Sequence, residues 1–233
     1  MSTPLVIAID GPAGAGKSTV AQKVAARLGL NYVDSGATYR ATALKVLQSG
    51  IAPDDEQAVA RLIAQTEIRI TTDGLQFRVL VDGQDVTEKI RTPEVTLASA
   101  RISRLPEVRA KLLPVQRSCA TGGGVVMEGR DIGTVVFPNA ALKVFLRADP
   151  AERARRRLKQ DSKKGRSATL EQTAGEIALR DQLDAERKIS PLVAAADAVE
   201  IDSTDLAAEQ VVERILALAN ERKLIGNEPK RAT

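Results

Sequence analysis

Two patterns of apolar and polar positions alternate along the chain. Short, continuous runs of aliphatic and β-branched residues, such as residues 5–9, predict strands buried on both faces of a parallel sheet. Stretches in which apolar residues recur every three or four positions, such as residues 18–28, predict amphipathic helices. The expected strands are 5–9, 31–34, 125–128, 142–146 and 198–202, and the expected helices are 18–28, 37–47, 93–102, 106–120, 150–160, 169–188 and one ending near residue 220. This alternation predicts an α/β fold, a doubly wound parallel sheet of about five strands flanked by helices.

Residues 66–87 interrupt that rhythm. Apolar and polar residues alternate singly on either side of Asp73-Gly74, and a second turn signal follows at Asp82-Gly83. Alternation with a period of two, broken by Asp-Gly pairs, is typical of antiparallel hairpins. We therefore expect a small antiparallel β insertion in the α/β fold.

The amino-acid composition excludes several classes of protein function. The net charge is only +4 and the aromatic residues are two tyrosines and three phenylalanines, so we expect no nucleic-acid partner. The sequence has no histidine, which excludes a Ser-His-Asp triad and a histidine-ligated zinc site. Its single cysteine, Cys119, excludes an intrachain disulfide. The first apolar run is far shorter than a membrane span, so we expect a soluble, cytoplasmic protein without a membrane partner.

A phosphate-binding loop follows the first predicted strand. It matches the pattern G-x-x-x-x-G-K-S/T and directly precedes a predicted helix, as that motif requires. Backbone N–H groups of such a loop surround phosphate oxygens, and the helix N-terminus adds a favourable dipole. The lysine would bridge the β- and γ-phosphates of ATP, and the serine hydroxyl would bind Mg²⁺. The expected nucleotide-binding residues are Gly11, Pro12, Ala13, Gly14, Ala15, Gly16, Lys17, Ser18 and Thr19, with Ser18 as the metal ligand.

The loop by itself indicates a nucleotide and leaves the reaction open. The guanine-reading pattern Asn-Lys-x-Asp is absent, since the nearest string, Asn31-Tyr-Val-Asp34, lacks the lysine. The Leu-Ser-Gly-Gly-Gln signature of transporter ATPases is also absent. A chain of 233 residues leaves little room for a helicase or a motor. The remaining class is that of small-molecule kinases.

Further motifs make the sequence resemble bacterial cytidylate kinases from Ile7 to about Thr204. The matching strings are Ile-Asp-Gly-Pro-Ala-Gly-Ala-Gly-Lys-Ser-Thr (9–19), Asp-Ser-Gly-Ala-Thr-Tyr-Arg (34–40), Pro-Glu-Val-Arg (106–109), Gly-Arg-Asp-Ile-Gly-Thr-Val-Val-Phe-Pro (129–138), Arg-Asp-Gln-Leu-Asp-Ala-Glu-Arg (180–187) and Ser-Pro-Leu (190–192). The resemblance implies a nucleoside monophosphate kinase that uses ATP and Mg²⁺ to phosphorylate CMP or dCMP, and we expect a monomer. The expected division of the chain is a core of residues 1–34, 121–150 and 189–222, a nucleoside monophosphate-binding region of residues 35–120, a lid of residues 150–188 and a flexible tail of residues 223–233.

The resemblance assigns substrate roles to several residues. Ser35 and Arg40 would hold the nucleotide and its phosphate, while Arg109 and Asp131 would read cytosine. A carboxylate that accepts the exocyclic amino group fits cytosine and rejects uracil, which presents a carbonyl at that position. Arg130 would add phosphate binding. The alternatives are a solvated helix residue for Arg40 and a turn-capping carboxylate for Asp131.

The last matching region adds charged residues on one helix face. Arg180, Asp184 and Arg187 are spaced to share that face, and the resemblance places Asp184 on the sugar hydroxyls and both arginines on phosphates. A surface salt-bridge ladder is the alternative. The expected catalytic residues are Lys17, Arg130, Arg180 and Arg187.

A basic cluster precedes that helix. It consists of Arg153, Arg156, Arg157, Lys163, Lys164 and Arg166, and it predicts a lid that closes arginines over ATP. Among these residues Arg157 is the expected ATP contact, and a solvated charged face is the alternative for any one of them.

Two positions depart from the family pattern. Glu128 stands where many relatives have aspartate, and Ala100 stands where many have a serine that contacts the base.

Two other functions remain open: a uridylate or adenylate kinase on the same scaffold, and a binding module that uses ATP as a switch. An acceptor phosphate is already anionic near neutral pH, so in-line transfer needs no general base.

Overall fold

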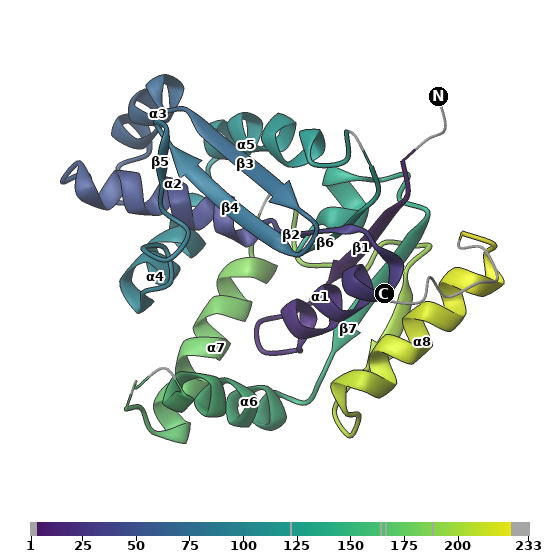
Figure 1. Ribbon diagram of the computed structural model, residues 1–233. Coiled ribbons are helices and arrows are strands. Elements are labelled where there is room, and N and C mark those ends of the chain that lie inside the picture. Colours follow the sequence, from purple (N-terminus) through teal and green to yellow (C-terminus); the bar gives the residue numbers. More distant parts are fainter. Residues whose placement is uncertain (1–3, 122, 164, 166, 188, 225–233) are drawn as a thin grey trace.

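The computed structural model describes residues 4–121, 123–163, 165, 167–187 and 189–224. Its centre is a five-stranded sheet in the order β2-β6-β1-β7-β8, in which every neighbouring pair is parallel (Figure 1). The strands are β1 (Val6–Asp10), β2 (Asn31–Asp34), β6 (Val125–Gly129), β7 (Leu142–Arg147) and β8 (Val199–Asp202). This confirms the predicted α/β sheet, and each strand lies within two residues of its expected range.

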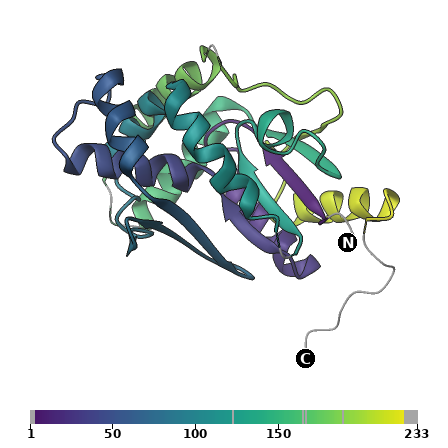
Figure 2. The same cartoon turned by 90° about the horizontal axis from the view of Figure 1, so that it is seen from above.

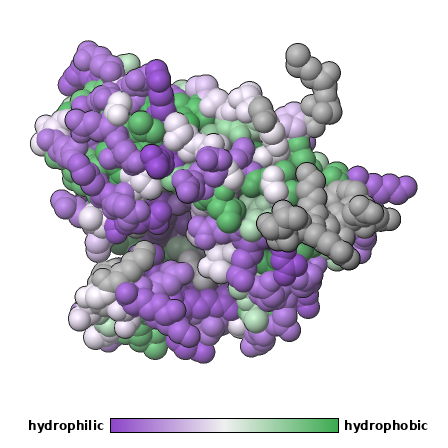
Figure 3. Space-filling model, viewed as in Figure 1, coloured by the Kyte–Doolittle hydropathy of each residue, from purple (hydrophilic) through white to green (hydrophobic). Residues whose placement is uncertain are grey.

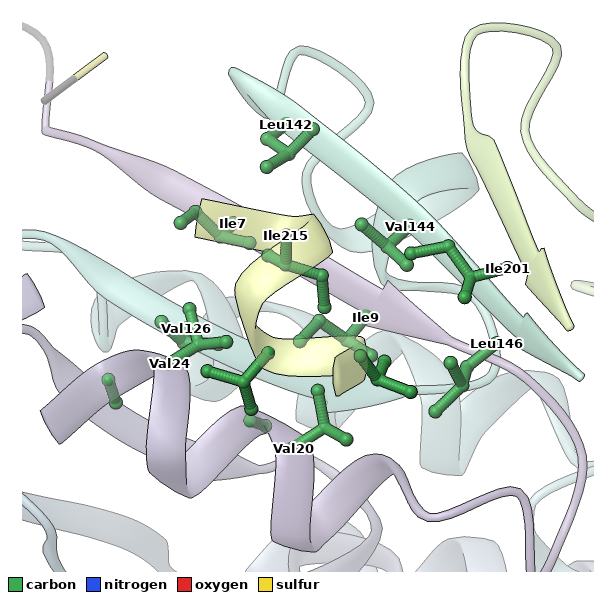
Figure 4. Packing of buried hydrophobic residues seen from close by; sticks show 14 of the residues in the cluster. Ile7, Ile9, Val20, Val24, Val126, Leu142, Val144, Leu146, Ile201 and Ile215 are labelled. Carbon is green, nitrogen blue, oxygen red and sulfur yellow. The ribbon is translucent and has the colours of Figure 1, made fainter. Parts of the chain in front are cut away.

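The two faces of the sheet carry separate apolar cores. Ile7 and Ile9 point to one face, where they pack with residues of α1 (Lys17–Leu28) and α8 (Ala208–Glu221) such as Val20 and Ile215 (Figure 4). Val6 and Ala8, which alternate with them along β1, belong to the cluster on the other face. Because both faces are covered, the central strand is apolar at every position until Asp10.

A second sheet confirms the predicted antiparallel insertion. It contains β3 (Ile68–Asp73), β4 (Gln76–Val81) and β5 (Gln84–Asp85) in sequence order. Its inner residues share an apolar cluster with four helices: α2 (Gly36–Gln48), α3 (Glu56–Gln65), α4 (Pro93–Ile102) and α5 (Pro106–Ser118). The hairpin tip reaches the edge of the parallel sheet, where the Tyr32 amide donates to the Gly74 carbonyl at 3.0 Å (Figure 2).

Two elements were not predicted. Helix α3 begins at an Asp55 cap, whose side chain accepts the Ala58 amide, and it buries only Val59 and Ile63. A turn of π-helix, η1 (Ile132–Val136), follows β6, and the Asp10 carboxylate accepts the amides of its first two residues. The π-helix depends on a partner that is distant in sequence, so no local pattern indicates it.

Two arginine-bearing helices complete the fold. They are α6 (Pro150–Lys163) and α7 (Leu170–Ala185), which lie against each other (Figure 1). Helix α6 extends three residues beyond its predicted end, and α7 begins after a Thr169 capping box and ends three residues before its predicted end. The predicted lid residues Lys164 and Arg166 lie outside the described residues, as does most of the predicted tail. Among the helices described, none is long and apolar enough to cross a membrane.

Candidate active site

A deep cleft opens at the carboxyl ends of β1, β2 and β6, where ligands bind in open α/β sheets. Its volume is about 690 Å³, and Figure 3 shows it as a hollow between α1, α4 and α7 with hydrophilic residues around it. The predicted site residues that line it are Ala13, Gly14, Ala15, Gly16, Lys17, Ser18, Thr19, Ser35, Arg40, Arg130, Asp131, Arg157, Arg180, Asp184 and Arg187. Three other predicted site residues are not among those that line it: Gly11, Pro12 and Arg109.

The phosphate-binding loop turns through backbone conformations that glycine adopts readily. Gly11 packs against β7 so closely that a Cβ would lie 2.0 Å from the Leu146 carbonyl oxygen. Gly14 and Gly16 have φ angles of 78° and 92°, in the left-handed region. Side chains at these positions would strain or block the loop. Glycine at these positions therefore permits the tight turn on which a phosphate-binding loop depends.

Lys17, the first residue of α1, is held over the loop. Its Nζ donates to the Pro12 carbonyl at 2.7 Å. Burial lowers the pKa of Lys17 to about 7, helped by the nearby positive charges of Arg130 and Arg180, while Glu128 and Asp184 oppose the shift. A buried ammonium group with two guanidinium groups beside it is poised for an anionic ligand.

Oxygen atoms suited to Mg²⁺ lie beside the loop. The Ser18 hydroxyl and the buried Glu128 side chain both line the cleft, and Glu128 Oε1 accepts the Tyr32 hydroxyl at 2.7 Å. Burial and the neighbouring Asp34 carboxylate raise the pKa of Glu128, whereas Lys17, Ser18 and Tyr32 lower it. The described residues contain no cluster of three metal-ligating side chains. Because Mg²⁺ keeps several waters and uses one or two protein oxygens plus phosphates, the Ser18–Glu128 pair fits it.

The N-terminus of α2 forms another part of the cleft, which Ser35, Gly36 and Arg40 line. The Ser35 hydroxyl donates to the Glu128 carbonyl at 2.7 Å, and Arg40 donates to Asp34 at 2.6 Å. Burial alone would raise the pKa of Asp34, but the Arg40 guanidinium holds it below its usual value. The structure therefore places Ser35 and Arg40 at the cleft with polar partners, and a ligand phosphate would compete with Asp34 for Arg40.

Arg109 and Asp131 form a buried ion pair, of which Asp131 lines the cleft. Arg109 donates to Asp131 Oδ2 and to the Ser103 carbonyl, and its guanidinium lies 5.5 Å from the centre of the Tyr39 ring. Asp131 Oδ1 accepts no hydrogen bond from the described part of the chain. The carboxylate is thus fixed by its neighbour while one oxygen is left for a ligand amino group.

Asp184 brings two arginines together. It is 1% exposed, accepts Arg130 Nε on Oδ2 at 2.7 Å and accepts Arg187 on Oδ1. The guanidinium of Arg180, one turn earlier on α7, makes no hydrogen bond or ion pair with the described residues. Burial and the Arg130 charge lower the pKa of Arg180 to about 9. An unpaired, partly buried guanidinium at the cleft is costly unless an anion binds there.

The described residues of the basic cluster have different surroundings. Arg153 is buried and donates to the Ala13 and Ala148 carbonyls. Arg156 binds the Ser203 carbonyl at 2.5 Å, while Arg157 lines the cleft and pairs with Asp161 at 3.2 Å. The solvated-face alternative is therefore wrong for Arg153, which is packed inside the protein.

Sequence reasoning missed three residues that shape the site. Asp10 binds the start of η1 and so orients Arg130 and Asp131 just before it; burial raises the pKa of Asp10 to about 6. Tyr32 holds Glu128, and Asp181 contacts the phosphate-binding loop. Of these three residues, only Asp10 could have been noticed in the local sequence, because it is a charged residue at the end of an apolar strand and beside Gly11.

The departure at position 100 also has a structural setting. Ala100 lines the cleft from α4, and the hydroxyls of its neighbours bind helix carbonyls: Ser99 to Thr96 at 2.7 Å and Ser103 to Ala100 at 2.9 Å. Each serine hydroxyl already uses its proton in a helix hydrogen bond, so it could offer a ligand only its acceptor lone pairs.

Comparisons with known proteins identify the family of this chain. The family model described as Cytidylate kinase matches residues 7–221. The chain is 50% identical over 212 residues to the cytidylate kinase of Pelotomaculum thermopropionicum, covering 91% of this chain and 94% of that protein. It is 49% identical to that of Geobacillus sp. strain WCH70, covering 95% and 99%. A solved structure of an uncharacterized protein from Eubacterium ventriosum shares the fold, with a TM-score of 0.51, 10% identity and coverage of 93% and 98%. The chain belongs to the cytidylate kinase family.

Proposed function

We propose that this protein transfers the γ-phosphoryl group of ATP to CMP, forming CDP and ADP, and that it also accepts dCMP. The observation that carries the proposal is that one cleft is lined by the phosphate-binding loop, by Arg180 and by Asp131, whose carboxylate is paired with Arg109. The family assignment supports the same activity, since the relatives are named cytidylate kinases.

Positioning and charge neutralisation account for the chemistry. The attacking oxygen belongs to a phosphate and is already anionic near neutral pH, so the lack of histidine is no obstacle. Lys17 would bind the β- and γ-phosphates of ATP, and the unpaired Arg180 would bridge donor and acceptor phosphates. Arg130 and Arg187, already oriented by Asp184, would complete the positive surroundings of the transferred group.

Ser18 and Glu128 are the residues that would hold Mg²⁺. When bound, the ion neutralises charge on the phosphate oxygens. Glu128 is one methylene longer than the aspartate of many relatives, and its carboxylate is held in place by the Tyr32 hydroxyl. This support explains how the longer side chain can act at the same place.

Asp131 would select the base. Its free Oδ1 can accept the exocyclic amino group of cytosine, whereas uracil would present a carbonyl oxygen to the same carboxylate. A buried polar group that loses its partner discriminates strongly, so we expect CMP to be preferred over UMP by at least about 100-fold in kcat/KM. Both carboxylate oxygens of Asp184 already accept hydrogen bonds from arginines. Asp184 would therefore stay paired when the substrate is dCMP, which lacks one sugar hydroxyl of CMP, and this favours acceptance of dCMP.

An acceptor panel tests the proposal. ADP release is measured for the purified protein with ATP, Mg²⁺ and each of CMP, dCMP, UMP and AMP. We expect rapid turnover with CMP and dCMP and little with the other two. A preference for UMP or AMP would make it a uridylate or adenylate kinase instead. ATP binding without any acceptor-stimulated turnover would indicate a nucleotide switch.

We further propose that the monomer is the active form and that the reaction takes place in the cytoplasm.

A further inference from the structure

The backbone of the phosphate-binding loop is held from outside the cleft by two side chains. Asp181 Oδ1 accepts the Ala13 amide at 3.3 Å, and Arg153 Nη1 donates to the Ala13 carbonyl at 3.1 Å. The two side chains also bind each other through Arg153 Nη1 and Asp181 Oδ2. Ala13 is thus bound on both its amide and its carbonyl side by one ion pair.

Neither side chain lines the cleft. Arg153 is 7% exposed and comes from the first turn of α6, where its Nε also donates to the Ala148 carbonyl. Asp181 comes from α7, directly after the cleft residue Arg180. The next loop residue, Gly14, packs against the same arginine, because a Cβ there would lie 3.0 Å from both Arg153 Cβ and the Arg153 carbonyl oxygen.

The loop has a reason to need such support. Gly11, Gly14 and Gly16 all have positive φ angles, and glycine loses more conformational freedom on ordering than any other residue. If the free loop sampled other conformations, ATP binding would have to order it and affinity would fall. A loop already fixed in shape binds phosphate without that loss.

We propose that Arg153 and Asp181 are positioning residues that hold the Ala13–Gly14 segment in its phosphate-binding conformation. Arg153 and Asp181 therefore act through the loop and do not touch the nucleotide. The inference rests on the proposed binding of ATP at this loop and is independent of the acceptor.

Removing the carboxylate tests this role. In the Asp181→Ala protein we expect the Kd for ATP, measured by calorimetry without acceptor, to rise by about tenfold or more. At saturating ATP the KM for CMP should stay within about twofold, because Asp181 does not line the cleft. The matched control is Glu186→Ala, which removes an exposed carboxylate near the end of the same helix that binds only Gln182 among the described residues and should leave both constants unchanged.

Two further variants, Asp181→Asn and a double variant without Arg153 and Asp181, test whether the pair acts by holding the loop. Asp181→Asn keeps the acceptor for the Ala13 amide and the side-chain volume, so it should lose less ATP affinity than Asp181→Ala and should fold if the alanine variant does not. Removing Arg153 and Asp181 together should harm ATP binding less than the sum of the two single changes, because neither charge is left buried alone.

Three results would overturn the proposal. One is a lower melting temperature of the Asp181 variants with an unchanged Kd for ATP, which would make the pair structural only. Another is tighter ATP binding on loss of Asp181, which would mean that the carboxylate restrains Arg153 from a direct phosphate contact. The third is a strictly additive double variant. Because ATP binding is measured without CMP, a failure of the proposed acceptor specificity would leave these outcomes readable.

Discussion

The depressed pKa of Lys17 predicts that ATP binding is accompanied by proton uptake. In the free protein burial, Arg130 and Arg180 hold this pKa at about 7. A bound triphosphate adds several negative charges beside the ammonium group and should restore its pKa toward the usual value near 10. At pH 8 about one tenth of the Lys17 side chains carry a proton before binding and nearly all carry one afterwards. Lys17 should therefore take up about 0.9 proton per ATP bound.

Calorimetry measures this number directly. ATP is titrated into the protein at pH 8, without metal, in buffers with different ionisation enthalpies, and the slope of observed heat against ionisation enthalpy gives the protons exchanged. Lys17→Arg is the matched control, because an arginine stays charged and should reduce the uptake to about 0.1 proton. Arg180, with a pKa of about 9, contributes only about 0.1 proton at this pH. Uptake near zero in the unchanged protein, or equal uptake in both proteins, would refute the reasoning.

Three further predictions concern residues around the cleft. Asp131→Ala should lower kcat/KM for CMP by about 100-fold while the Kd for ATP changes less than twofold; equal losses would remove Asp131 from the acceptor site. Asp10→Asn should change the pH dependence of stability. Folding raises the pKa of Asp10 from 3.8 to about 6. The stabilisation that comes from its protonation is therefore complete below pH 3.8 and is lost as the pH rises through 6. In urea titrations, the unfolding free energy of the unchanged protein relative to the variant should fall by about 1 kcal/mol between pH 5 and pH 7. A flat difference would contradict the assigned cause. Tyr32→Phe deprives the buried Glu128 carboxylate of a donor and should lower the unfolding free energy by about 2 kcal/mol, whereas a change below about 0.5 kcal/mol would mean that the hydrogen bond is not needed.

Local pattern was sufficient for the main sheet and for the loop. Leu5–Ile9 is continuously apolar because β1 is covered on both faces, and that burial is visible in the sequence itself. The glycines of the loop were also visible in the local sequence, because each is required either by a positive φ angle or by a close approach of another part of the backbone. The insertion was predictable from its alternation and its Asp-Gly turns.

Other features depend on partners far apart in the chain. The π-helical turn at Ile132 forms where Asp10, 122 positions earlier, accepts its amide. Asp181 lies 168 positions from the Ala13 amide that it binds, and Tyr32 lies 96 positions from Glu128. A single sequence contains no periodicity that connects such residues, so it indicated the groups at the cleft and not the side chains that hold them in place.

The central claim is that this cleft holds a pyrimidine mononucleotide opposite the ATP loop. A crystal structure of the protein with CMP tests it most directly. We expect the cytosine amino group within hydrogen-bond distance of Asp131 and the phosphate among Arg40, Arg130 and Arg180. Cytosine bound away from Asp131 and Arg109, or a cleft left empty at saturating CMP, would contradict the account.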